Sequence, residues 1–113
     1  MGLNFSISDA SWSYSGFHQF RKRLAASIGF NLDDMYGFGG TGSWALIKDN
    51  IKPFLKHSDC SGYLTIQQMT KVIPRLRIIT ACWPENDYDR KAAARLADDM
   101  EQAVKKGTHC EFC

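Results

Sequence analysis

The stretch DYDRKAAARLADDMEQAVKKG, residues 87–107, has the start signal, the periodicity and the stop signal of one long helix. Asn86 or Asp87 can accept a hydrogen bond from the first turn, and Gly107 can take the left-handed conformation that ends a helix. Spacings of three and four place five small or apolar side chains on one face, namely Tyr88, Ala92, Leu96, Met100 and Ala103. This stretch therefore predicts a helix from about Asp87 to Lys106 that must pack against other elements.

Two helices are predicted in the first half of the chain. One begins after Ser15 and ends at Gly29, and its apolar residues again recur at spacings of three and four. The basic residues 21–23 spread around its other side, so we expect them to face solvent. The second helix begins at Ser43, and we expect Pro53 to kink or break it.

A third helix and two short strands complete the predicted elements. TIQQ, residues 65–68, has the form of a capping box and predicts a helix that ends before CWPEND, residues 82–87. Apolar residues alternate in LNFSIS, residues 3–8, which is typical of a strand, and the tail at 108–113 is a second candidate. The predicted fold class is mainly α: a compact single-domain bundle of about four helices, in which the termini can form a short two-stranded pairing.

Bulk composition limits the classes of function. The chain has 113 residues, 44% hydrophobic and 23% charged, which is ordinary for one globular domain. A net charge of +2 does not indicate a nucleic-acid-binding protein, and no apolar run approaches the ~20 residues of a membrane span. The first residues lack the basic and apolar blocks of a secretory signal. We therefore expect a cytoplasmic protein with no cofactor and no membrane partner.

The segment HSDCSGYLTIQQ, residues 57–68, has the outline of a calcium-binding EF-hand loop. Gly62 stands where such loops turn sharply. The ligands are mostly missing, because Asp59 is the one carboxylate, Ser61 is a weak substitute, and Gln68 replaces the bidentate glutamate. We predict a degenerate EF-hand-like helix–loop–helix connection in which Gly62 has positive φ and no metal binds. A metal-binding module with Asp59, Ser61 and Gln68 as ligands is kept as an alternative.

Over nearly its whole length the chain resembles a group of short hypothetical proteins of bacteria and their phages. The words that carry the resemblance are SWSYSGF (11–17), HSDCSGYLT (57–65), PRLRII (74–79), DYDRKAAARLADDM (87–100) and EFC (111–113). The resemblance implies that related chains can carry acidic residues at the positions of Ser61 and Gln68, so that this chain departs toward losing a metal. It implies a phage or prophage origin and supplies no catalytic residue.

A glycine-rich loop, GFGGTGSW at 37–44, is the main candidate for a ligand site. Backbone amides before a helix N-terminus can hold a phosphate, an indole can stack on a ring, and lysines add charge. The residues of this hypothesis are Gly39, Gly40, Thr41, Gly42, Trp44 and Lys48. Lys52 and Lys56 would extend a lysine stripe at spacings of four. The alternative interpretation is a flexible loop followed by a solvated lysine face.

A protein partner is the other candidate. Phe38 lies between glycines and Tyr36 is close by, so both could be exposed for docking, with Phe38 the better candidate. No Cys–His or Ser–His arrangement predicts a nucleophile. The leading hypothesis is a small non-enzymatic helical binding protein of phage type that binds a host protein, such as a host-defence component. The alternatives are binding of an anionic small ligand such as a nucleotide, and the metal-binding module.

Overall fold

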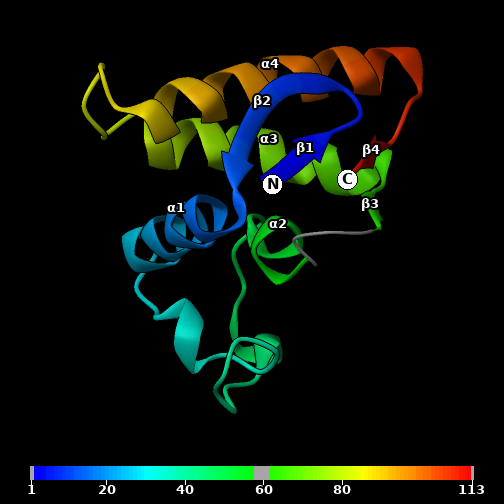
Figure 1. Cartoon of the computed structure of the whole chain (residues 1–113). Coiled ribbons are helices and arrows are strands. Elements are labelled where there is room, and N and C mark those ends of the chain that lie inside the picture. The colour runs from blue at the N-terminus through cyan, green and yellow to red at the C-terminus, as the bar shows by residue number, and fades with distance from the viewer. Residues whose placement is uncertain (1, 58–61, 113) are drawn as a thin grey trace.

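The computed structural model describes residues 2–57 and 62–112. Its two longest helices, α3 (Ile66–Thr80) and α4 (Tyr88–Lys106), lie side by side and run in opposite directions (Figure 1). Asp87 accepts a hydrogen bond from the Arg90 amide at 3.1 Å, and Gly107 ends α4 with φ of 72°. These are the predicted start and stop, and both are confirmed.

The capping box at the start of α3 is also confirmed. The Thr65 hydroxyl accepts from the Gln68 amide at 3.1 Å, and the Gln68 side-chain oxygen accepts from the Thr65 amide at 2.9 Å. Two amides that a helix start would leave without partners are satisfied by this reciprocal pair. The local sequence therefore determines where α3 begins.

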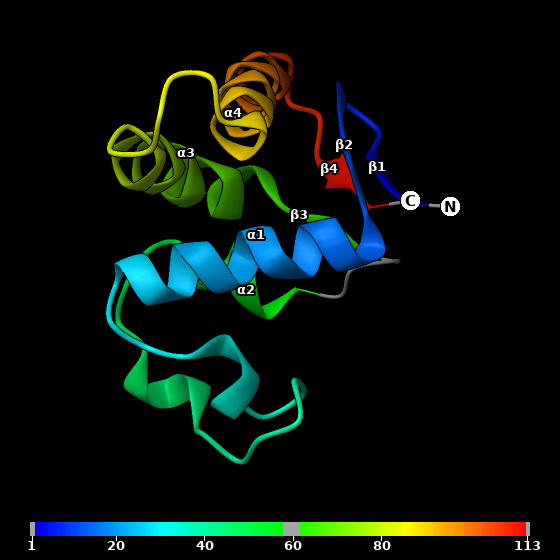
Figure 2. The ribbon, with the colours of Figure 1, turned by 60° about the vertical axis from the view of Figure 1, so that its left-hand side comes forward.

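Helix α1 (Tyr14–Ser27) lies beneath the α3–α4 layer (Figure 2). It begins slightly earlier than predicted, because the Ser13 hydroxyl accepts from the Gly16 amide at 3.0 Å. Gly29, with φ of 94°, follows its end as predicted. Its buried face includes Phe17 and Phe20, which are fully enclosed.

The predicted N-terminal strand is confirmed as far as Phe5, but Ser6 and Ile7 form a turn, and the main partner of the strand is not the tail. Strand β1 (Gly2–Phe5) pairs with β2 (Ser8–Ser13) in an antiparallel hairpin, and β3 (Tyr63–Leu64) pairs with β4 (Cys110–Glu111). A hairpin of neighbouring strands closes a shorter loop than a pairing of the termini does, and so costs less chain entropy.

The termini still meet. An isolated bridge joins Phe5 to Phe112, and the Ser6 amide donates to the Glu111 carbonyl at 3.0 Å. The predicted two-stranded pairing of the termini is thus reduced to this contact beside the β1–β2 hairpin and the β3–β4 pair.

The predicted second helix is corrected by the structure. Ser43 caps only a 3₁₀ turn, η2 (Trp44–Leu46), and α2 (Lys52–Lys56) is a separate short helix. The chain turns between them because the Asp49 carboxylate accepts from the Ile51 amide at 3.0 Å, an alternative to helical hydrogen bonding. Pro53 does not break a helix: it lies in the first turn of α2, where no amide donor is needed.

Residues 30–50 form a projecting lobe below α1 (Figures 1 and 2). It contains a second 3₁₀ turn, η1 (Leu32–Asp34), and the glycine-rich loop. Buried Leu32 and Trp44 join the lobe to the hydrophobic core of the molecule. The glycine-rich loop of this lobe was predicted, but the end of the lobe was not, because a helix was expected from Ser43 onward.

Aromatic rings make up much of the core. Trp12 stacks on Phe20 with ring centroids 4.6 Å apart, and the ring of Phe17 contacts that of Phe54 edge to face at 5.7 Å. Fully burying one such side chain contributes about 1.5–3 kcal/mol relative to leaving it in water. The expectation that Trp12 and Phe17 belong to the core is confirmed.

In the part of the chain that is described, no helix is both long and apolar enough to cross a membrane.

The basic residues of α1 are not the solvated face that the sequence predicted. Arg21 is 2% exposed and donates hydrogen bonds to the carbonyls of Leu55 (3.1 Å) and His57 at the end of α2. Lys22 pairs with Asp33 at 2.9 Å. Each of these cations has a specific partner because α1 is covered on several sides by later segments of the chain.

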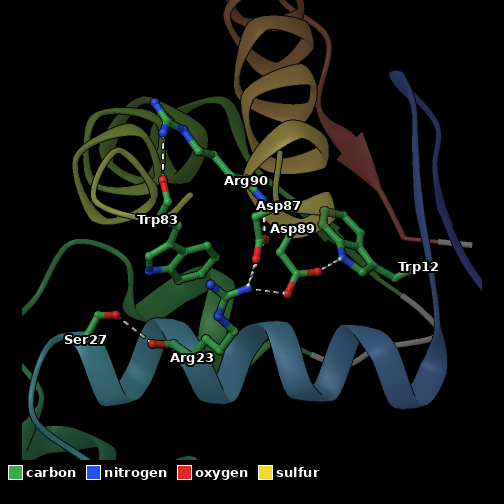
Figure 3. Close-up of polar contacts among 7 residues, drawn as sticks. All are labelled: Trp12, Arg23, Ser27, Trp83, Asp87, Asp89 and Arg90. Atoms are coloured by element: carbon green, nitrogen blue, oxygen red, sulfur yellow. Dashed lines mark hydrogen bonds and ion pairs between the residues drawn. The ribbon is translucent and has the colours of Figure 1, made fainter. Parts of the chain in front are cut away.

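Arg23 is the centre of a polar cluster that we call the arginine junction, made of Trp12, Arg23, Trp83, Asp87 and Asp89 (Figure 3). Arg23 binds the carboxylates of Asp87 and Asp89 at 3.0 Å each, and its guanidinium lies 3.8 Å from the centroid of the Trp83 ring. The Trp12 indole donates to Asp89 at 3.0 Å. The junction therefore ties α1, β2 and the start of α4 together.

Candidate functional site: a lysine-lined hollow

A surface hollow of about 420 Å³ lies between residues 47–56 and the first half of α3. We call it the lysine hollow, because four lysines line it together with a few smaller groups. The lining residues are Ile47, Lys48, Asp49, Asn50, Lys52, Pro53, Lys56, Gln68 and Lys71.

Local structure explains how the lysines meet. Lys52 and Lys56 are the first and last residues of α2, so their spacing of four places them on one face. Lys48 directly precedes the turn made by Asp49, which brings it back toward α2. Lys71 comes from α3, three residues after Gln68 and on the same face. Three lysines of the predicted stripe are thus brought together, although the continuous helix that predicted the stripe does not exist.

The charges in the lysine hollow are uncompensated. Within residues 2–57 and 62–112, none of the four lysines forms an ion pair. Asp49 is the one described carboxylate in the lining, and Arg75 binds it through two hydrogen bonds of 2.9 and 2.7 Å. Among the described residues, the hollow therefore has four positive charges and one carboxylate already neutralised by an arginine.

Asp49 remains ionised beside these lysines. Burial alone would raise the pKa of its carboxyl, but hydrogen bonds from Arg75 and from the Ile51 amide lower the pKa below its usual range. The carboxylate is thus fixed in position and charge. It holds the turn that presents Lys48 and does not act as a partner for it.

The glycine-rich loop is built differently from the phosphate-binding loop that the sequence suggested. The Gly40 amide donates to the Met35 carbonyl at 3.3 Å, and the Gly42 amide donates to the Asp34 carbonyl at 2.8 Å. A Cβ at Gly40 would lie 2.1 Å from the Asp34 carbonyl oxygen, so glycine is required there by the close approach of two backbones. These amides close the loop on itself and are not directed at a ligand.

The remaining residues of that hypothesis are separated. Gly39 and Thr41 are exposed in the loop, and η2 has only three residues, too few for a helix-dipole site. Trp44 is 7% exposed and its indole donates to the Tyr36 carbonyl at 2.9 Å. Lys48 lines the lysine hollow, which Trp44 does not. The structure therefore does not place the loop amides, Trp44 and Lys48 in one site.

Trp44 instead lines a second hollow of about 420 Å³, which we call the aromatic hollow. Its lining residues are His18, Arg21, Tyr36, Gly37, Phe38, Trp44, Lys56 and His57. Phe38 is half-buried there: its ring stacks on His18 at 6.3 Å and lies 5.2 Å from the Arg21 guanidinium carbon. Tyr36 is 74% exposed. Of the two residues predicted to meet a partner, Tyr36 is thus the accessible one, which reverses the expected preference for Phe38.

The degenerate EF-hand-like loop is described only in part. Gly62 has φ of 83°, as predicted, while Asp59 and Ser61 lie outside the described residues. The side-chain oxygen of Gln68 is engaged in the capping box, and the His57 ring contacts the Tyr63 carbonyl at 3.1 Å. Among the described residues, no group of three or more His, Cys, Asp or Glu side chains could hold a metal ion.

Sequence reasoning missed Lys71 and the role of Arg75. Gln68, Lys71 and Arg75 follow one another at spacings of three and four, so a polar, basic face of the predicted third helix was visible in the sequence. What the sequence did not show is which segment this face meets. Lysine ammonium groups on flexible stems, three donors each, are suited to anionic oxygens.

Comparisons of the chain with family models, with curated proteins and with solved structures found no match.

Proposed function

We propose that the protein is a non-enzymatic binding protein that holds the anionic groups of its partner in the lysine hollow. One observation carries the proposal: Lys48, Lys52, Lys56 and Lys71 surround one hollow and have no ion-pair partner among the described residues. Like charges gathered in a concave surface raise the local concentration of an oppositely charged ligand.

The contrast with four arginines of the chain supports a binding role. Arg23, Arg75, Arg77 and Arg95 each pair with at least one carboxylate. Four neighbouring lysines that repel one another gain nothing for folding from their positions, since like charges at such spacings destabilise by a few tenths of a kcal/mol. An anion in the hollow relieves this repulsion and makes charge-assisted hydrogen bonds of about 1.5–3 kcal/mol each.

The chemistry of the hollow favours phosphate-type groups over a ring. Its apolar lining consists mainly of Ile47 and Pro53, which offer no aromatic surface for stacking. Point charges on flexible stems bind tetrahedral oxyanions without the planar geometry that an arginine requires. A nucleotide would therefore be held here by its phosphates.

The test uses tripolyphosphate and isothermal titration calorimetry on the full chain. We expect binding by the wild-type protein and a loss of at least about tenfold in affinity in the Lys52→Glu/Lys71→Glu double variant, because one lost charged hydrogen bond is worth that factor. The matched control is Lys91→Glu/Lys105→Glu on α4, which changes the net charge equally and lies outside the hollow. Equal affinities of the two double variants, or no binding by the wild type, would overturn the proposal.

A second candidate function is docking of a protein partner on the projecting lobe. Tyr36 and Leu46 are 74% and 78% exposed there, more than other large apolar side chains among the described residues. A host protein as the partner is supported by the resemblance to phage proteins. In the test, a purified candidate partner should bind the wild type more tightly than Tyr36→Ser/Leu46→Ser, while Tyr14→Ser leaves the affinity unchanged. No difference between these variants would remove the lobe as the docking surface.

A further inference from the structure

The two hollows share one lining residue. Lys56 lines both the lysine hollow and the aromatic hollow, so the two hollows adjoin at this residue. The lysine hollow contributes Lys48, Lys52 and Lys71, whereas Arg21 in the aromatic hollow is 2% exposed and its guanidinium donates to backbone carbonyls. Each hollow is about 420 Å³, so a single phosphate or short polyphosphate fills only part of the combined surface.

Asp49 is the one described carboxylate that lines either hollow. Asp49 is bound by Arg75, and no Asp or Glu lines the aromatic hollow. The net charge of +2 does not reveal this local cluster of lysines. Most carboxylates of the chain are paired with cations elsewhere, as in the arginine junction. A linear polyanion thus meets a basic surface that the composition does not reveal.

The aromatic hollow adds an exposed ring. Tyr36 is 74% exposed and lines it, and Phe38 is fixed beside it by Arg21 and His18. Cations that follow a backbone, together with an exposed ring on which a base can stack, are the features of single-strand binding. An acidic peptide offers charges without bases, and a duplex keeps its bases stacked inside.

We infer that the anionic partner is single-stranded nucleic acid, with phosphates in the lysine hollow and over Lys56 and a base stacked on Tyr36. The inference rests on the proposed function and names the class of partner. The binding should weaken with salt, because each neutralised phosphate of a single strand contributes about 0.7 to the slope of log affinity against log salt.

The experiment measures the fluorescence anisotropy of a labelled oligothymidylate. The wild-type protein should bind it more tightly than it binds a duplex of the same length or polyglutamate of similar charge. Tyr36→Ala should lose about tenfold in affinity, within the range for one stacked base, and Tyr14→Ala, an exposed tyrosine outside both hollows, should lose none. Lys52→Glu/Lys71→Glu should lower both the affinity and the salt slope.

The other outcomes separate this inference from the proposed function. If polyglutamate or the duplex binds as tightly and Tyr36→Ala has no effect, the partner is not a single strand, while tripolyphosphate binding in the lysine hollow would keep the proposed function. If the oligothymidylate does not bind, the inference is overturned whatever tripolyphosphate does.

Discussion

The arginine junction and the lysine hollow differ in whether their positive charges are paired with carboxylates. In the junction, Arg23 is held by two carboxylates and lies over the Trp83 ring (Figure 3). In the hollow, four lysines surround a surface whose one described carboxylate is bound to an arginine. The first arrangement holds helices together, and the second leaves charge available to a ligand. A carboxylate partner therefore marks the structural charges here, and the gathering of unpaired charges around one hollow marks the candidate functional ones.

The largest effect on stability is expected at the junction. Asp89→Ala removes the acceptor of the Trp12 indole and one partner of Arg23, leaving a buried donor without a hydrogen bond. We expect the free energy of unfolding to fall by about 2 kcal/mol. Asp98→Ala is the control, because Asp98 is on the same helix and pairs with Arg77 but is 66% exposed, so its loss should stay within about 0.5 kcal/mol. Equal losses in urea denaturation would show that the junction is not a structural tie.

The second-largest effect is expected on lowering the pH, which should weaken the arginine junction. Hydrogen bonds from Arg23 hold the pKa of Asp87 below its usual range, although burial opposes them. Because the folded-state pKa is the lower one, the stabilisation is present above the unfolded value of about 3.9 and is lost as pH falls through the folded pKa. Asp87→Asn should therefore be less stable than the wild type at neutral pH and approach it in acid. Parallel curves of melting temperature against pH would contradict this sign.

The smallest effect on stability is expected for substitutions in the lysine hollow. Lys52→Glu/Lys71→Glu replaces two of four mutually repelling charges, so the free energy of unfolding should stay unchanged or rise by up to about 0.5 kcal/mol. Urea denaturation at low salt measures this. A loss of more than about 1 kcal/mol would mean that these lysines support the fold, and the comparison with the junction would no longer hold.

Local signals in the sequence predicted the elements that local contacts determine. The Asp87 cap, the Gly107 stop and the Thr65–Gln68 capping box involve residues within one turn of each other, and all are present. The end of the lobe could not be predicted in this way. Its turn depends on Asp49, which is held by Arg75, 26 positions further along the chain.

The candidate site could likewise be predicted only where it depends on local spacing. The lysine stripe was found from spacing alone, because Lys52 and Lys56 do share one helical face. Lys71 was not included, since its place beside α2 depends on how α3 packs. Arg21 and Arg23 were expected in solvent because their partners lie far away in sequence.

The most direct test of the central claim is an NMR titration that detects the lysine ammonium groups, with tripolyphosphate as the ligand. The four lysines of the hollow should shift together and saturate with one dissociation constant, because they contact the same anion. Lys91, Lys105 and Lys106 on α4 should stay near their starting positions. Equal, unsaturated shifts at all lysines would show nonspecific charge attraction, and would contradict the account of the lysine hollow as a binding site.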